Sequence, residues 1–136
     1  MTLDHFLNLY HSQKVDYDRK YGYQCVDLFR MYIERVLGLP QPESVKSAKD
    51  FWHNYEKMPR LAKYFEKTTE GRTGDFAIWD ARPNNPHGHI ALIIGSVKGE
   101  PLVFHQDGYS QQGATFKQLY TPYLLGFLHP KEEYLD

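Results

Sequence analysis

The sequence lacks several features that would place it outside the ordinary globular proteins. It has one cysteine among 136 residues, so no intramolecular disulfide can form and packing must build the framework. Its formal net charge is -1 and it has no basic block, which argues against a nucleic-acid partner. The start, MTLDHFLNLY, is interrupted by polar residues and matches neither a signal peptide nor a membrane span. We expect a monomeric domain that binds no nucleic acid and does not insert into a membrane.

The spacing of apolar residues changes about halfway along the chain. In the first half they recur at steps of three and four, which predicts helices over about residues 3–10, 24–37 and 48–67, the last broken near Pro59. Short aliphatic and aromatic runs later predict strands over residues 76–79, 89–94, 102–106 and 123–129. Helices followed by an antiparallel sheet indicate a single α+β domain over residues 1–130. Residues 131–136 are predicted to be a tail or the start of a linker.

The single cysteine, Cys25, lies where a polar, turn-rich segment gives way to the second predicted helix. A thiol in the first turn of a helix faces unpaired backbone N–H groups and the positive end of the helix dipole, and both favour the thiolate. The alternative is a packing role, because free cysteine is among the most buried residue types. The residues around Cys25 favour a nucleophile.

A cysteine nucleophile needs a general base, which is most often histidine. The segment PHGHIALII holds His87 and His89, and His89 begins an apolar strand that can aim its ring accurately. We therefore predict His89 as the base, with His87 as the weaker candidate. Asp107, at the end of the next strand, is the candidate that orients the base, although Asp-Gly is also a strong turn signal. Gln24 and the Cys25 backbone N–H are candidate donors to an oxyanion.

Four blocks in this order, YQCVDL, GDFAIW, GHIALI and VFHQD, resemble the CHAP family of cysteine, histidine-dependent amidohydrolases and peptidases. The resemblance spans residues 16–129. Family members are papain-like peptidoglycan hydrolases, commonly catalytic modules of bacteriophage endolysins and bacterial autolysins. It implies a papain-like fold with N-terminal helices packed on a C-terminal antiparallel sheet. It also implies that the chain cleaves an amide bond of bacterial peptidoglycan, as an N-acetylmuramoyl-L-alanine amidase or a peptide endopeptidase.

The resemblance assigns Cys25 as nucleophile, His89 as base and Gln24 as oxyanion donor. The family's third member is usually Asn, Asp or Glu, commonly within a Glu-Gln-Asn sequence. Here that sequence reads His105, Gln106, Asp107. Asp107 can therefore take the orienting role, while a histidine replaces the family's glutamate.

The segment before Cys25 also suggests a metal site. Five of its residues fall at the ligand positions of an EF-hand calcium loop: Asp16, Asp18, Lys20, Gly22 and Asp27. Lys20 offers only its carbonyl and Tyr21 stands where an EF-hand needs glycine, so the motif itself is absent. Three carboxylates with two carbonyls nevertheless suit a hard cation. Some phage members of the family have a calcium site here, with an Asp-x-Asp-Gly pattern in which this chain has Arg19 for the glycine. We predict Ca²⁺ and no organic cofactor, with a solvated acidic turn as the alternative.

Two other classes of function stay open from the sequence. His87 and His89, two apart on a strand, can present both imidazoles to one zinc ion, with Asp107 or His105 as a further ligand. That interpretation leaves the Gln24–Cys25 pair without a purpose. Eleven tyrosines could instead serve a non-enzymatic module that binds wall glycan. With no secretion signal, a phage lysin present in the host cytoplasm before its release to the wall is the more natural source. The sequence does not decide which bond is cut.

Overall fold

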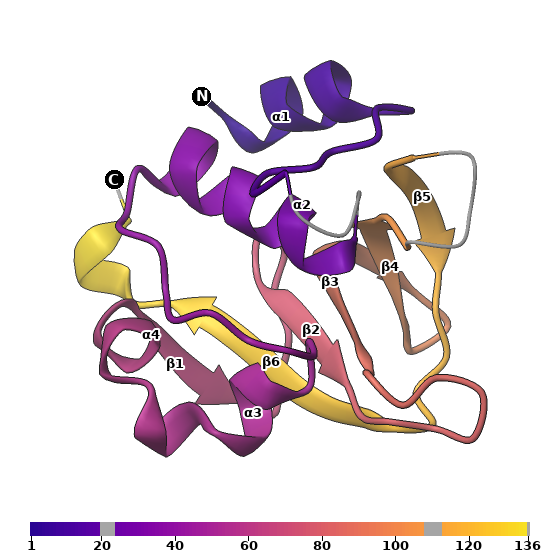
Figure 1. Ribbon diagram of the computed structural model, residues 1–136. Helices are drawn as coiled ribbons and strands as arrows, with labels where there is room; N and C mark the ends of the chain where they lie inside the picture. The colour runs from indigo at the N-terminus through magenta and orange to yellow at the C-terminus, as the bar shows by residue number, and fades with distance from the viewer. Residues whose placement is uncertain (20–23, 108–112, 136) are drawn as a thin grey trace.

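The computed structural model describes residues 1–19, 24–107 and 113–135, and it confirms the predicted α+β order (Figure 1). The helical elements are α1 (Leu3–Tyr10), α2 (Cys25–Tyr32), η1 (Ile33–Leu37), α3 (Asp50–His53), η2 (Tyr55–Lys57), α4 (Pro59–Tyr64) and η3 (Glu132–Tyr134). The strands are β1 (Phe65–Thr68), β2 (Phe76–Trp79), β3 (His89–Val97), β4 (Glu100–His105), β5 (Thr115–Gln118) and β6 (Leu124–Pro130). They form one antiparallel sheet in the order β1-β6-β2-β3-β4-β5.

Two strands were not expected from the sequence. The third predicted helix extends to residue 67, but residues 65–68 form β1, where Phe65 pairs with Pro130 of β6. The helix prediction was wrong there because pairing with a distant strand outweighed the local apolar spacing. Pro59 begins α4 at a position where a missing N–H costs nothing. The other missed strand, β5, is a mostly exposed edge strand without an apolar run.

Helix α2 begins at Cys25, one residue after the predicted start at Gln24, because its first turn is capped. Gln24 is the N-cap residue, and its backbone N–H donates to Oδ2 of Asp27 over 3.0 Å. The helix continues into the π-helical turn η1, which ends at Leu37 and has Gly38 as its C-cap residue. Gly38 has φ 63°, a left-handed conformation that glycine adopts without strain. The capping contact therefore fixes which residue starts the helix, and that residue carries the thiol.

The sheet separates a large core from a small one. The large core lies between the helices and one sheet face, and it is rich in fully buried phenylalanines: Phe6, Phe29, Phe51, Phe65, Phe76 and Phe104. Helix α2 packs on β3 at this face. The small core, on the opposite face, consists of Ala77, Trp79, Ala91, Ile93 and Val103. His89 and His105 continue the rows of β3 and β4 that point to this second face.

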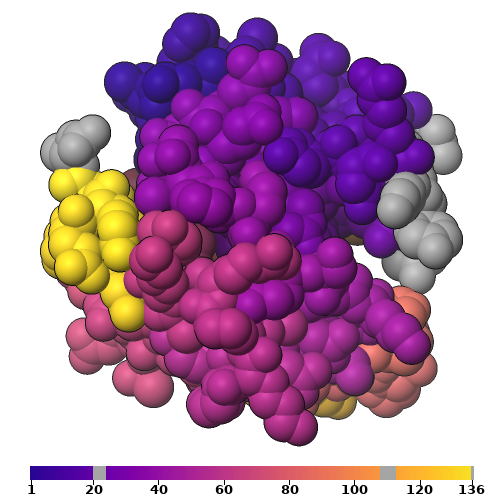
Figure 2. Space-filling model, turned by 60° about the vertical axis from the view of Figure 1, so that its left-hand side comes forward, coloured from indigo at the N-terminus to yellow at the C-terminus, as the bar shows by residue number. Residues whose placement is uncertain are grey.

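The surface in Figure 2 is covered mainly by the helical first half of the chain, with the C-terminal segment at its left edge. That segment is held against the domain, since Tyr134 packs on Tyr64 with ring centroids 4.7 Å apart. Among the residues that the structure describes, no helix combines the length and apolar character needed to cross a membrane.

Candidate active site

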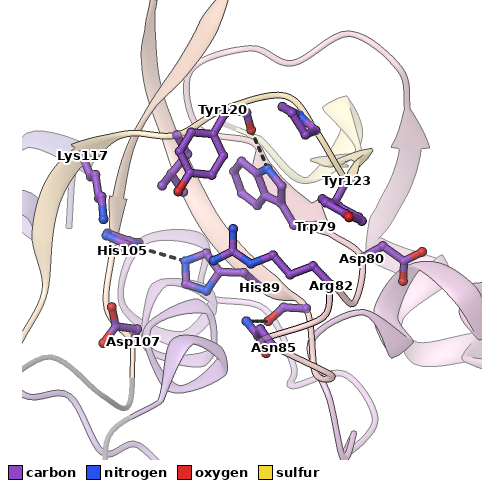
Figure 3. Close-up of a pocket in the computed structure, with 13 residues that line it drawn as sticks. Trp79, Asp80, Arg82, Asn85, His89, His105, Asp107, Lys117, Tyr120 and Tyr123 are labelled. Atoms are coloured by element: carbon purple, nitrogen blue, oxygen red, sulfur yellow. Dashed lines mark hydrogen bonds between the residues drawn. The ribbon is translucent and has the colours of Figure 1, made fainter.

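His89 and His105 are hydrogen-bonded to each other at the ends of two neighbouring strands. His89 is the first residue of β3 and His105 is the last of β4. Nε2 of His89 lies 2.8 Å from Nδ1 of His105, and the two rings meet edge to face. Figure 3 shows this pair in a pocket of about 100 Å³ that Asp107 also lines. The structure thus brings the predicted base and the predicted orienting acid into one pocket, and it adds His105 as the direct partner of the base.

Both imidazoles are neutral at neutral pH. Burial, followed by the charges of His105 and of nearby cations, lowers the pKa of His89 to about 3, although the charge of Asp107 acts in the opposite direction. Burial and Lys117 lower the pKa of His105 to about 4. Of two neutral rings that share a hydrogen bond, one donates and the other accepts. If Nε2 of His89 donates, its Nδ1 carries no proton and can accept one.

The Cys25 thiol lies beside the start of β3. It contacts the backbone of Ile90, the residue that follows the predicted base His89. A backbone hydrogen bond from Ile90 lowers the pKa of this thiol, as does one from Val26. Burial outweighs both and raises the pKa to about 11, and the negative charge of Asp27 adds to the increase. This direction is opposite to the one expected from the helix start alone. Cys25 is therefore a neutral thiol at rest, and it needs a base to become a nucleophile.

Gln106 joins the strand that carries His105 to the segment that carries Cys25. Its side chain is 1% exposed. Its amide nitrogen donates to the carbonyls of Val15 and Gln24 over 2.6 and 2.8 Å, and its amide oxygen accepts from the N–H of Val15 over 3.0 Å. No role for this glutamine was predicted from the sequence, because nothing local distinguishes a buried linking amide from an exposed one. Gln24 itself is exposed, directly before the thiol.

His87 is engaged elsewhere. Its Nδ1 lies 2.7 Å from Oγ of Ser47, and the residue is exposed on the loop before β3. Within the described ranges, the groups close enough to share a metal ion do not include His87 or His89. The geometry therefore gives the zinc alternative no support.

Three of the predicted calcium ligands are close together. Asp16, Asp18 and Asp27 each offer an oxygen within 4.8 Å of the others. Asp27 is buried, and burial raises its pKa to about 6, with the charges of Asp18 and Asp16 adding to the increase. A set of carboxylate oxygens at this separation fits a hard cation such as Ca²⁺. The other two predicted ligands, Lys20 and Gly22, lie outside the described residues.

Comparison with solved structures identifies proteins with a similar fold. The crystal structure of Ly7917 matches with a TM-score of 0.62 at 15% identity, covering 79% of this chain and 53% of that one. A crystal structure of Ly7917 with the hydrolyzing product of MDP gives 0.60 at 16% identity, with the same coverage. The wild-type endolysin LysIME-EF1 gives 0.62 at 20% identity, covering 96% and 64%. The chain thus spans between half and two thirds of the length of these proteins, and their likeness confirms the papain-like α+β fold.

A search of curated proteins finds no match. The family model for the CHAP domain matches residues 14–107. This range includes Cys25, His89, His105 and Asp107, and it covers more than half of the chain. The protein belongs to the CHAP domain family.

Proposed function

We propose that this protein is a peptidoglycan hydrolase of the endolysin type, which cleaves an amide bond of the bacterial cell wall through a cysteine nucleophile. The observation that carries the proposal is the hydrogen bond between the rings of His89 and His105, with the Cys25 thiol against the backbone of Ile90. Family membership supports it, as do an endolysin among the structural neighbours and another neighbour crystallised with a hydrolysis product of MDP.

The reaction would run through an acyl-enzyme. Nδ1 of His89 takes the thiol proton as the sulfur attacks the carbonyl carbon, and the oxyanion is stabilised by Gln24 and the Cys25 backbone N–H. The tetrahedral intermediate collapses, the C–N bond breaks, and His89 returns the proton to the leaving amine. Water then attacks the thioester and gives a proton to His89, which passes it to the sulfur as the carboxylic acid leaves.

His105 and Asp107 divide the orienting role in this scheme. We assign the donor role in the His89–His105 hydrogen bond to the Nε2–H of His89 and the acceptor role to His105, which leaves Nδ1 of His89 ready for the thiol proton. The carboxylate of Asp107 favours the charged imidazolium that forms during the reaction, since its charge raises the pKa of both rings. A neutral imidazole stabilises an adjacent cation less than the family's usual glutamate would, so the charge of Asp107 matters more here.

We also propose that Asp16, Asp18 and Asp27 hold Ca²⁺, with the carbonyls of Lys20 and Gly22 as further ligands. The ion would supply positive charge that offsets the repulsion among the carboxylates. Asp27 also accepts the N–H of Gln24, so this site and the start of α2 share a residue. The three carboxylates thereby brace the segment that delivers Cys25.

In this proposal the protein acts as a monomer on the cell wall, after its release from the host cytoplasm.

Mass spectrometry of the fragments released from purified walls identifies the bond that is cleaved. A new amino terminus on L-alanine indicates the amidase, and one within the stem or cross-bridge indicates the endopeptidase.

Cys25→Ala tests the mechanism. We expect this variant to lose clearing of purified cell walls while its circular dichroism and Tm stay close to those of the wild type. A thiol alkylator should have the same effect, and a zinc chelator that spares calcium should have none. Undiminished clearing by Cys25→Ala would exclude the cysteine mechanism.

A further inference from the structure

Two cations, Arg82 and Lys117, face the pocket that holds His89 (Figure 3). Both side chains are exposed, and neither forms an ion pair within the part of the chain that the structure describes. Two carboxylates also line the pocket. Asp80 accepts from the N–H of Ala81 over 2.8 Å and lies 2.9 Å from Nε2 of His53. Asp107 lies next to His105, at the end of the pocket away from Asp80 (Figure 3).

The loop that carries Arg82 has a fixed shape. Arg82 and Asn85 exchange two backbone hydrogen bonds of 2.9 Å, and the Asn85 side chain donates to the carbonyl of Gly88 over 3.0 Å. Gly88 has φ 70°, and a Cβ there would lie 2.3 Å from the carbonyl oxygen of Trp79. The loop is thus closed tightly against β2. The guanidinium it presents lies 6.0 Å from the centre of the Tyr120 ring, across the pocket.

Lys117 reaches the pocket from the edge strand. It pairs with Val103 across β4 and β5, so its side chain points to the same sheet face as His105, two residues further along β4. Its positive charge lowers the pKa of both His105 and His89.

These cations oppose the step that the mechanism requires. His89 must become positively charged when it takes the thiol proton, and Arg82 and Lys117 both disfavour that charge, as burial and His105 do. Asp107 alone among the facing groups favours it. An anion bound between the two cations would offset their effect on His89 and would gain two charge-assisted contacts of its own.

We propose that this pocket is a carboxylate-binding subsite, in which Arg82 and Lys117 hold a free carboxylate of the substrate peptide beside the base. The inference rests on the proposed function and names its substrate class. The protein prefers stem peptides with a free carboxylate near the scissile amide over stems in which that group is a carboxamide. Tyr120 and Tyr123 form the aromatic wall that covers the rest of the peptide.

The test uses two synthetic stem peptides that differ only in this group, a carboxylate in one and a carboxamide in the other. We expect wild-type kcat/KM to be about tenfold higher for the carboxylate peptide, the size of one charged hydrogen bond. Arg82→Gln and Lys117→Gln should each remove most of that preference, because each lowers kcat/KM for the carboxylate peptide relative to the carboxamide peptide. Lys57→Gln, an exposed lysine on η2, is the matched control and should keep the preference.

Binding of the same peptides to Cys25→Ala separates this inference from the proposed function. A tenfold tighter Kd for the carboxylate peptide, lost on adding Arg82→Gln, supports the subsite even if the wild type clears no walls. Equal Kd values for the two peptides, or an equal loss for both on Arg82→Gln, overturn the subsite even if wall hydrolysis is confirmed.

Discussion

At the scale of single residues, the partner of His89 is set by sheet geometry. Leu92 pairs with Phe104, and continuing this register places Asp107 opposite His89 and His105 on the diagonal. An imidazole is long enough to reach across a diagonal, which lies at about 7 Å in antiparallel sheets. The hydrogen bond that the structure gives to the His89 ring therefore goes to His105.

Replacing His105 tests its role as a positioning residue. We expect His105→Ala to lower kcat about a hundredfold with little change in KM, because His89 loses the acceptor that fixes its tautomer. His105→Glu should keep most of the activity and raise the pKa of His89, since a carboxylate favours the imidazolium. The base works only when unprotonated, so the acid limb of the kcat profile should move to higher pH in His105→Glu. A purely structural role would leave that limb in place.

At the scale of elements, two contacts attach the start of α2 to the rest of the fold. Gln106 binds the carbonyl of Gln24 from the end of β4. Asp27 caps the helix from within and belongs to the acidic cluster. The thiol of Cys25 is therefore positioned by one link to the sheet and by one link to the candidate metal site, and each can be removed separately.

Gln106→Met tests the link to the sheet. It leaves the N–H and carbonyl of Val15 and the carbonyl of Gln24 without their buried partner, at a cost of about 1 to 3 kcal/mol for each unsatisfied group. We expect a lower Tm in thermal unfolding and a fall in kcat at temperatures where the variant is still folded. Gln118→Met, on the exposed edge strand, is the control, with a change within about 0.5 kcal/mol. Equal effects of the two substitutions would contradict the linking role of Gln106.

Removal of calcium tests the other link. A calcium chelator should lower Tm and wall-clearing activity together, because an ion that binds only the folded state stabilises it in proportion to its occupancy. Adding Ca²⁺ back should restore both. Asp18→Asn should respond weakly to either treatment. If neither Tm nor activity changes in the wild type, the three carboxylates are an acidic turn and hold no structural calcium.

At the scale of the whole molecule, a buried histidine ties the C-terminal segment to the sheet. His129 of β6 contacts Asp75 through Nδ1 and Glu132 of η3 through Nε2. Burial by itself lowers the pKa of His129, but the hydrogen bonds to both carboxylates outweigh it and raise the pKa above its ordinary value of 6.5. This network joins three segments that are distant in sequence or lie in different elements.

The raised pKa makes part of the stability depend on pH. A histidine whose pKa is higher in the folded state stabilises fully below the unfolded value of 6.5, and that stability is lost as pH rises through the folded value. We expect His129→Gln to lower the free energy of unfolding more at pH 6 than at pH 9 in urea titrations. His89 and His105 have lowered pKa values and act in the opposite sense, so the comparison with wild type is needed. An equal loss at both pH values would show that folding does not raise the pKa of His129.

The sequence by itself determined the order of helices before strands, the start of α2 within one residue of Cys25 and the end of η1 before Gly38. It also identified His89 as the candidate base and the three clustered aspartates as candidate metal ligands. Each of these follows from residues a few positions apart, whose apolar spacing, capping partners and chain direction act locally.

Tertiary structure alone decided the strand at 65–68, the His89–His105 contact, the buried amide of Gln106 and the raised pKa of the Cys25 thiol. Each depends on groups far apart in the sequence, such as Gln106 and Val15, 91 positions apart. Strand register and burial bring such groups together, and no local spacing encodes either, because a shift of one residue in pairing turns every side chain to the other face of the sheet. The sequence therefore named the candidate catalytic residues, and the folded sheet decided which groups surround each of them.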